Sequence, residues 1–416
     1  MDESPRNLRT MLAEAKDHSE LMIDLAYAAL FFNDEDMAEE VDDLESDMLD
    51  RVHDMREICI LAARNVREAE QMSSVLLVVS AIERMSVAAI DISRIVTHNL
   101  GIPPALLHDL AHAQEVSHRV RVRDDSALSH KTLESLELPT ELSMRVVAIK
   151  RSKQWMIDPD GEDIIMPDDV LIVRGSPDGI GGLREMAGAP NWNVPPPVDD
   201  GAPSDLDRAV DVLVEMKDIS EVAVGLAYSA ILFSDRSLAA EVAHLEDRID
   251  AMREHLEVWI LRAASEMLDP SSLRGLLRLG GAAEEIGDAA QQLVWLIERD
   301  EEMHPILQIS LGESDEVVVR MPVANDCEIA DKTLGEVKLE IETGFFLLAI
   351  RRASSYIYRP RSNVQIKGGD ELIATGPGEG REYLAKLCGY HFLQDDETGE
   401  WELALAGESE TENLEN

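Results

Sequence analysis

Several residue types are scarce in this chain of 416 residues, and each scarcity excludes a class of protein. Only three cysteines are present (Cys59, Cys327 and Cys388), far apart in the sequence, which indicates a reducing compartment without a disulfide or zinc framework. No apolar run approaches the roughly 18 residues that a spanning helix needs, and the N-terminal MDESPRNLRT lacks a signal core. We therefore expect a cytoplasmic protein.

Basic residues are also few, because 38 Lys and Arg face 83 Asp and Glu, giving a net charge of −45. Phosphate groups are bound by basic surfaces, so this charge excludes a nucleic-acid partner and disfavours docking on anionic lipid. The acids are spread along a chain with ordinary amounts of Leu, Val, Ile and Ala, unlike a disordered protein. The composition indicates a folded protein with a solvated acidic surface, as in a salt-rich cytoplasm.

An internal repeat is the most informative feature of the sequence. LAYAALFF at 25–32 returns as LAYSAILF at 226–233, and KTLESLEL at 131–138 returns as KTLGEVKL at 332–339. These and all other matched segments are offset by the same 201 residues, without a gap. The chain is therefore a tandem duplication of about 8–188 and 209–389, joined by a segment rich in Pro, Gly and Asp.

Each copy has two unlike halves. The first half has apolar residues at three- and four-residue spacing, with breaks near Asn33-Asp34 and Val66, which predicts three long antiparallel helices. The second half has short Val- and Ile-rich runs between turn residues, such as FFLLAIRR and ELIAT, which predict strands. The predicted order is a helical bundle (8–115), an α+β domain (116–188), a linker (189–206), a second bundle (207–314), a second α+β domain (315–389) and an acidic tail (390–416).

The α+β half resembles the C-terminal domain of potassium-transport regulators, called TrkA-C or RCK-C. Residues 332–377, from KTLGEVKLEIETGFFLLAIRR to GGDELIATGP, follow its pattern, and 131–176 depart from it where Ser143 replaces the glycine found at Gly344. The helical half resembles a PhoU-type three-helix unit, through LEDRID at 245–250 and EEIGD at 284–288. The fold class is thus α+β multidomain, with two PhoU-like bundles alternating with two TrkA-C domains.

The resemblance implies a cytoplasmic regulatory subunit of a membrane cation channel or transporter, with potassium as the first candidate ion. It implies that ligand or metal binding is coupled to transport, and that the protein lies at the inner face of the membrane through its integral-membrane partner. The duplication predicts an intramolecular pseudo-dimer and leaves a homo-oligomer open. The alternatives are a regulator of a magnesium or other divalent-cation transporter, a regulator of a phosphate transporter, and a metal-binding protein.

Neither a nucleotide site nor an enzyme is expected from the motifs. Regulators of this kind often carry a Rossmann domain ahead of TrkA-C, but here the helical bundle occupies that position, and no GxGxxG opens a βαβ unit. GPGEG at 376–380 is interpreted as a strand-to-helix turn, so NAD and ATP are not expected. No nucleophile or catalytic triad stands out.

Two acid pairs in the second copy form the candidate metal site. Glu246 with Asp250, and Glu284 with Asp288, are four residues apart, which places each pair on one helix face. Carboxylates from two helices would suit Mg, Mn or Fe. The other interpretation is a solvated acidic stripe, since acids are abundant throughout the chain.

The repeat provides an internal comparison for these acid pairs. At the positions of Asp250 and Asp288 the first copy has Leu49 and Val87, so it cannot form the same site. Those two apolar residues could simply face the neighbouring bundle.

A cyclic dinucleotide is a second possible ligand, because some TrkA-C domains bind cyclic di-AMP at their dimer interface. The positions that would hold it are Glu340 and Phe346 here, and Pro139 and Arg145 in the first copy, which suit a phosphate poorly. Only Arg351, Arg352 and Tyr356 offer compensating groups, and their other interpretation is a charge cluster at a strand end.

Overall fold

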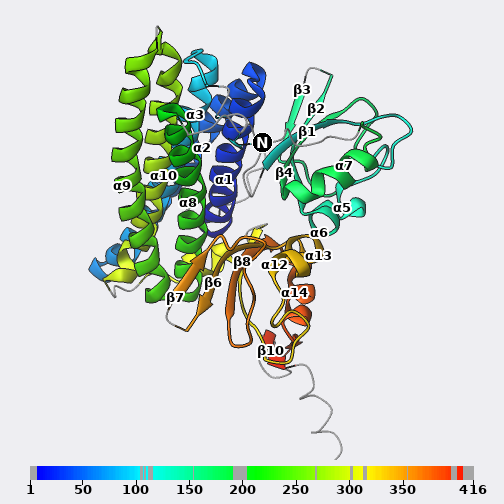
Figure 1. Cartoon of the computed structure of the whole chain (residues 1–416). Coiled ribbons are helices and arrows are strands. Elements are labelled where there is room, and N and C mark those ends of the chain that lie inside the picture. Colours follow the sequence, from blue (N-terminus) through cyan, green and yellow to red (C-terminus); the bar gives the residue numbers. More distant parts are fainter. Residues whose placement is uncertain are drawn as a thin grey trace, which may run out of the picture.

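The structure is a computed structural model of the whole chain (Figure 1). It describes residues 7–103, 106, 109–110, 116–152, 154–190, 204–267, 269–299, 303–312, 316–353, 355–394 and 401–405. Most of the predicted linker and the final GESETENLEN lie outside the described residues.

The first helical half forms three long helices, α1 (Leu8–Phe32), α2 (Glu35–Ala62) and α3 (Val66–Thr97). The breaks lie where the sequence predicts them. Asn33 ends α1 in the left-handed conformation (φ 49°), and the Asp34 side chain caps α2 by accepting a hydrogen bond from the Met37 backbone N–H. Asn65 caps α3 in the same way, through Glu68 N–H.

The second helical half repeats this arrangement with α8 (Asp205–Phe233), α9 (Arg236–Glu266) and α10 (Arg274–Glu298). A capping box between Ser204 and Asp207 begins α8. Pro270 opens a 3₁₀ turn (Pro270–Leu273) ahead of α10, and a short helix α11 (Ile306–Leu311) follows it. None of the described helices is long and apolar enough to cross a bilayer.

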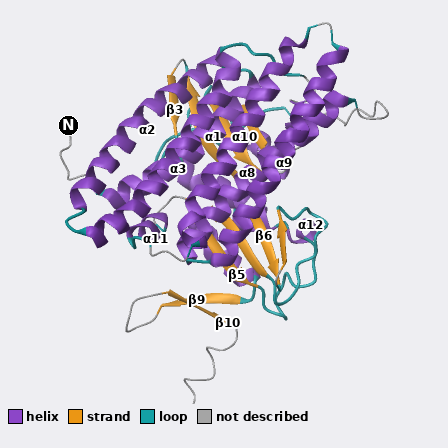
Figure 2. Ribbon diagram, turned by 90° about the vertical axis from the view of Figure 1, so that its left-hand side faces the viewer, coloured by secondary structure: helices purple, strands orange, loops and turns teal. Residues whose placement is uncertain are grey.

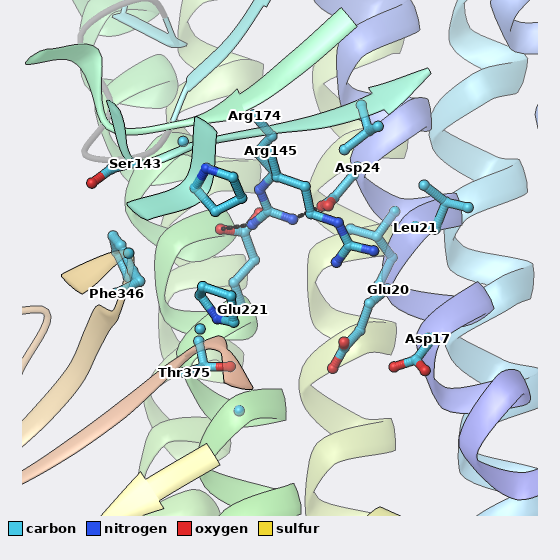
Figure 3. A pocket seen from close by; sticks show the side chains of 18 of the residues that line it. Asp17, Glu20, Leu21, Asp24, Ser143, Arg145, Arg174, Glu221, Phe346 and Thr375 are labelled. Atoms are coloured by element: carbon cyan, nitrogen blue, oxygen red, sulfur yellow. Dashed lines mark ion pairs between the residues drawn. The ribbon is translucent and has the colours of Figure 1, made fainter. Parts of the chain in front are cut away.

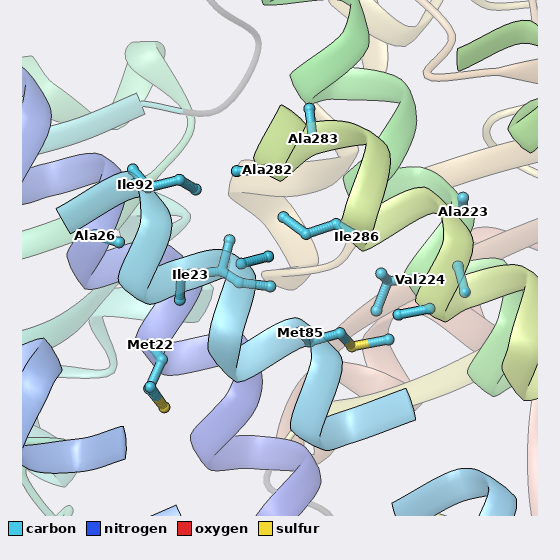
Figure 4. Close-up of a cluster of buried hydrophobic side chains, with 14 of the residues drawn as sticks. Met22, Ile23, Ala26, Met85, Ile92, Ala223, Val224, Ala282, Ala283 and Ile286 are labelled. Carbon is cyan, nitrogen blue, oxygen red and sulfur yellow. The ribbon is translucent and has the colours of Figure 1, made fainter. Parts of the chain in front are cut away.

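The two bundles share one hydrophobic core. Helices α3 and α10 lie against each other, and Figure 4 shows Met85 and Ile92 of α3 facing Ile286 of α10. Ion pairs at this contact join Arg84 to Glu285 and Arg278 to Asp91, so residue numbers rise along one helix as they fall along the other. The helices are therefore antiparallel, and the two copies are related by an approximate twofold axis.

Two small sheet domains stand beside the bundles (Figures 1 and 2), each with its own hydrophobic core. Their antiparallel strand orders, β1-β4-β2-β3 and β5-β8-β6-β7, are the same. The β2–β4 and β6–β8 pairings each carry an irregularity at equivalent positions. The strands are β1 (Val116–Arg121), β2 (Met144–Arg151), β3 (Gln154–Ile157), β4 (Val170–Gly175), β5 (Glu316–Pro322), β6 (Phe346–Arg352), β7 (Ser355–Tyr358) and β8 (Glu371–Pro377).

Short helices complete each sheet domain. Two of them, α6 (Leu138–Leu142) and α13 (Leu339–Thr343), pack against each other and join the sheet domains. Ser143 and Gly344, which follow them, are both left-handed, with φ of 52° and 72°, so the residue that departs from the TrkA-C pattern keeps the backbone of the glycine it replaces. The others are α5 (Leu133–Leu136), α7 (Ile180–Met186), α12 (Leu334–Val337), α14 (Arg381–Leu387) and the 3₁₀ turns Pro177–Gly179 and Gly378–Gly380.

The structure differs from the sequence prediction after residue 389, where an acidic tail was expected. The described part of this segment is an antiparallel hairpin of β9 (Tyr390–Gln394) and β10 (Trp401–Leu405). Apolar residues alternate along both strands, and Phe392 and Leu403 pack on the core of the second sheet domain. Acidic residues around the hairpin obscure this alternation in the sequence.

Candidate functional site

Three of the four acids predicted to form a metal site come together between α9 and α10. Glu246, Asp250 and Asp288 each offer a carboxylate oxygen, and these oxygens lie within 4.8 Å of one another. The side chains differ in exposure, because Glu246 is buried, with 9% exposed, whereas Asp250 is exposed and Asp288 is half-buried. Such an all-oxygen set fits Mg, Mn or Fe better than zinc, which prefers His or Cys.

The charges in this cluster oppose one another. Burial, followed by the charges of Asp250 and Asp288, raises the pKa of Glu246 to about 7. Burial and Asp288 also raise the pKa of Asp250. Gln291 Nε2 donates a hydrogen bond of 2.9 Å to Glu246 Oε2 and orients that carboxyl. A cation among these groups would relieve the repulsion.

Glu284, the fourth predicted ligand, lies outside the cluster. Its Oε2 accepts a hydrogen bond of 2.9 Å from Arg253 Nη1 of α9. The four-residue spacing placed Glu284 and Asp288 on the same helix face, but the neighbouring arginine draws the first of them away from the other acids.

A residue of the first copy completes the cluster, and the sequence interpretation missed it. Arg84 of α3 donates to Asp288 Oδ2 at 2.7 Å and to Glu285 Oε1 at 2.5 Å. The repeat contains a signal for this contact, because Arg84 and Glu285 occupy the same position in the two copies and the twofold axis brings them together. A guanidinium from one bundle thus neutralises an acid of the other.

The equivalent surface of the first copy carries no such cluster in the described residues. Leu49 and Val87, which replace Asp250 and Asp288, are 45% and 42% exposed. Both side chains are therefore only partly covered, and the interpretation that they face the neighbouring bundle stays a prediction. Glu83, the equivalent of Glu284, pairs with Arg56 at 2.5 Å.

A second polar centre lies where both sheet domains meet the helices (Figure 3). Arg174 of β4 pairs with Asp24 of α1 and approaches Glu221 of α8 at 3.7 Å. Arg359, directly after β7, is held by Asp218 at 2.8 Å and by Glu221 at 3.5 Å. Glu221 therefore contacts one arginine from each sheet domain.

Glu221 is held in its charged form by these neighbours. Burial favours the neutral acid, but Lys217, Arg174 and Arg359 together outweigh it, and the pKa of Glu221 is lowered to about 2. Lys217 Nζ lies 2.7 Å from its carboxylate. Lys217 also faces the ring of Tyr27 in the other copy, as Lys16 faces that of Tyr228, which shows the twofold relation again.

A cavity of about 400 Å³ opens beside this centre, with walls from both bundles and both sheet domains. The four positions considered for a cyclic dinucleotide, Pro139, Arg145, Glu340 and Phe346, all line it. Arg145 pairs with Asp158 at 3.1 Å, so its guanidinium already has an acidic partner. Acids outnumber bases in the lining, which does not favour a phosphate ligand.

The three residues named as compensating ligands lie elsewhere, at the ends of β6 and β7. Arg351 pairs with Glu371 at 3.2 Å, and Arg352 pairs with the buried Asp370 at 2.7 Å. The Tyr356 hydroxyl lies 3.0 Å from Ser237 Oγ of α9. None of the three lines the cavity, and their contacts are those of a structural cluster at a strand end.

The sequence interpretation also missed the second polar centre, around Glu221. Its residues differ between the copies, because Asp24, Arg174 and Arg359 correspond to Gly225, Thr375 and Asp158. Charged residues that appear in only one copy could have indicated this polar centre. Nothing in the sequence, however, places α8 beside both sheets.

Comparison with protein families finds two domains, each matched twice. The PhoU domain matches residues 12–96 and 213–295, and the TrkA-C domain matches residues 118–188 and 318–389. The two kinds of domain thus alternate along the chain, in agreement with the helical bundles and the sheet domains. Comparison with curated proteins finds no match.

Among solved structures, PhoU from Pseudomonas aeruginosa is similar at 15% identity, with a TM-score of 0.38, over 70% of this chain and 93% of that one. The GsuK channel bound to NAD is similar at 12% identity, with a TM-score of 0.18, over 77% of this chain and 65% of that one. The GsuK RCK domain is similar at 13% identity, with a TM-score of 0.18, over 74% of this chain and 78% of that one.

Proposed function

We propose that this chain, in which two PhoU domains alternate with two TrkA-C domains, is a regulatory protein of ion transport that acts on a membrane cation channel or transporter. Potassium is the first candidate ion, because the TrkA-C domains of this chain resemble the C-terminal domains of potassium-transport regulators. The protein would be cytoplasmic and would reach the inner face of the membrane through its transporter. No catalytic role, nucleotide or nucleic-acid partner is part of this proposal.

The contact between Glu221 and the two arginines carries the proposal. Because Arg174 and Arg359 come from different TrkA-C domains, a shift of either domain changes the environment of one half-buried carboxylate in the PhoU bundle. A ligand that binds one arrangement of the TrkA-C domains more tightly would therefore change the population of bundle arrangements. An attached transporter would respond to that change.

Two experiments test this function. Gentle affinity purification from membranes in native salt should recover an integral-membrane transporter together with the protein, and recovery of none would remove most of the support. Uptake of potassium, magnesium and phosphate, measured in cells lacking the protein and in cells supplied with it, should identify the transported ion.

The role of the contact between Glu221 and the two arginines can be tested in the same cells. Glu221→Gln should impair regulation, whereas Glu20→Gln, the matched residue of the other copy, should do so less. Equal regulation by wild type and Glu221→Gln would contradict the role of this contact.

We also propose that Glu246, Asp250 and Asp288 bind a divalent cation such as Mg, Mn or Fe, which would supply a fixed positive charge between α9 and α10. This site would serve either as the input of the regulator or as the site of a metal-binding protein. Manganese should raise the melting temperature of the wild type and not that of Asp288→Ala. Equal shifts in both would contradict the site and leave the transport proposal standing.

A further inference from the structure

Two of the three cysteines come together in the second TrkA-C domain, although they are far apart in the sequence. Cys327 lies in the turn that follows β5, and Cys388 ends α14. The Ala324 N–H, at the start of that turn, donates to the Cys388 carbonyl at 2.9 Å. A Cβ placed on Gly389 would lie 2.9 Å from the Cβ of Cys327, so the chain next to Cys388 touches Cys327.

The first TrkA-C domain shows that the fold does not require this pair. Its equivalent residues are Ser126 and Ala187, on the same backbone. The Arg123 N–H donates to the Ala187 carbonyl at 3.1 Å, and Ser126 N–H donates to the Arg123 carbonyl, as Cys327 N–H does to Ala324. The two cysteines are therefore an addition to one copy, at two positions that the fold brings close together.

We propose that Cys327 and Cys388 are a peroxide-reactive pair that forms a reversible disulfide within the second TrkA-C domain. The Cys327 thiolate attacks one oxygen of hydrogen peroxide, the O–O bond breaks, and a sulfenic acid and hydroxide form. Cys388 sulfur then attacks the sulfenic sulfur, the S–O bond breaks, and the thiol proton leaves with the hydroxide as water. In total, two thiols lose two electrons and two protons, and one peroxide becomes two waters.

The exposure of the two thiols sets the order of these steps. Cys327 is half-buried and accessible to a small oxidant, whereas Cys388 is fully buried. Burial, with a smaller contribution from Cys327, raises the pKa of Cys388, which makes this thiol unreactive toward peroxide in solution. Oxidation therefore begins at Cys327, and Cys388 reacts only with the sulfenic acid formed beside it.

The bond would join the turn after β5 to the end of α14, at the start of the β9–β10 hairpin. It would stiffen one TrkA-C domain and leave the other unchanged, so the two members of the pseudo-dimer would differ under oxidising conditions.

The test uses the full chain treated with hydrogen peroxide, followed by denaturation, thiol counting and mass analysis. The wild type should fall from three free thiols to one, lose the mass of two hydrogens, and recover three with dithiothreitol. Cys327→Ser and Cys388→Ala introduce the residues of the first copy, which occupy the same backbone. Neither variant should form the bond, and only Cys388→Ala should yield a dimedone adduct, at Cys327.

Cys59 provides an internal control, because it is buried in α2 and burial raises its pKa to about 11. Cys59→Ala should still lose both remaining thiols to one intramolecular bond. Three free thiols retained by the wild type, disulfide-linked dimers in place of the internal bond, or equal oxidation of Cys59 would each overturn the proposal. These outcomes do not depend on the transport function, which the uptake measurements test separately.

Discussion

At the scale of single residues, two glutamates at equivalent positions of the two copies make different contacts. Glu20 and Glu221 each pair with a lysine of their own helix, at 2.9 Å and 2.7 Å. Glu221 has in addition the arginines of both sheet domains, whereas Thr375 and Asp158 occupy the corresponding positions around Glu20. Divergence at two positions has thus made one glutamate of the pair an interdomain contact.

Replacing Glu221 by Gln should lower the free energy of unfolding by about 1–3 kcal/mol, because the lysine and the two arginines lose one shared anion and keep only their other acidic partners, Asp24 and Asp218. Chemical unfolding at neutral pH measures this loss. Glu20→Gln is the matched control, and it should cost less because that side chain is more exposed. Similar losses in the two variants would contradict the special position of Glu221.

The same contact predicts an acid dependence. The pKa of a glutamate in the unfolded chain is about 4.3, whereas the pKa of Glu221 in the folded protein is about 2. Because the folded value is the lower one, the stabilisation is complete above roughly pH 5 and is lost as the pH falls toward 2. The difference in unfolding free energy between wild type and Glu221→Gln should therefore narrow with acidification, and a constant difference would contradict it.

The acid cluster shows how far residue patterns could be read from the sequence. The repeat and the four-residue spacing identified Glu246, Asp250 and Asp288, because both depend only on position along the chain. The sequence could not show that Arg253 draws Glu284 away, or that Arg84 arrives from the other copy. Those contacts depend on side-chain conformations and on helix packing between distant segments.

At the scale of elements, the contact between α6 and α13 depends on close backbone approach. Gly344 has a φ of 72°, and a Cβ on it would lie 2.8 Å from the Pro139 carbonyl oxygen of the other sheet domain. Gly344→Ala should therefore destabilise the protein by about 1–3 kcal/mol, through backbone strain and this collision. Chemical unfolding checks the change.

Ser143→Gly is the control for that prediction. Ser143 already has a φ of 52°, so glycine there relieves strain and should be neutral or stabilising by up to about 1 kcal/mol. Equal destabilisation by both variants would show that backbone strain and crowding do not govern this contact.

The contact between α3 and α10 provides a matched pair of arginines. Arg84 neutralises Asp288 of the cluster, whereas Arg278 pairs with Asp91, outside it. Arg84→Gln should raise the affinity of the protein for manganese about tenfold, because it removes a guanidinium that competes with the metal ion for Asp288. A tenfold change corresponds to a binding free energy of about 1.4 kcal/mol. Arg278→Gln should leave that affinity unchanged. Titration calorimetry distinguishes the two, and equal affinities in both variants would contradict the competition.

Most elements could be predicted because their signals are local. Helix breaks at Asn33-Asp34 and the strands FFLLAIRR and ELIAT follow from period and turn residues alone. The β9–β10 hairpin could not be predicted, because short strands among acids gain stability only from packing on the second sheet domain.

At the scale of the whole molecule, the duplication joins both halves of a twofold assembly in one chain. A true dimer must carry every interface residue twice, whereas a tandem copy can place Arg84 on one side and Asp288 on the other. The acid cluster, the contacts of Glu221 and the cysteine pair are all asymmetric, and all of them lie in the second copy or depend on it. The approximate symmetry maintains the fold, and departures from it form the candidate sites.

The net charge of −45 acts on the molecule as a whole. Repulsion among surface acids opposes the compact state, and it weakens as the Debye length falls from about 10 Å at 0.1 M salt to about 3 Å at 1 M. The melting temperature should therefore rise as potassium chloride is raised over this range. Sodium chloride should act equally if screening is the cause, whereas a flat or falling melting temperature would contradict the salt-rich cytoplasm inferred from the composition.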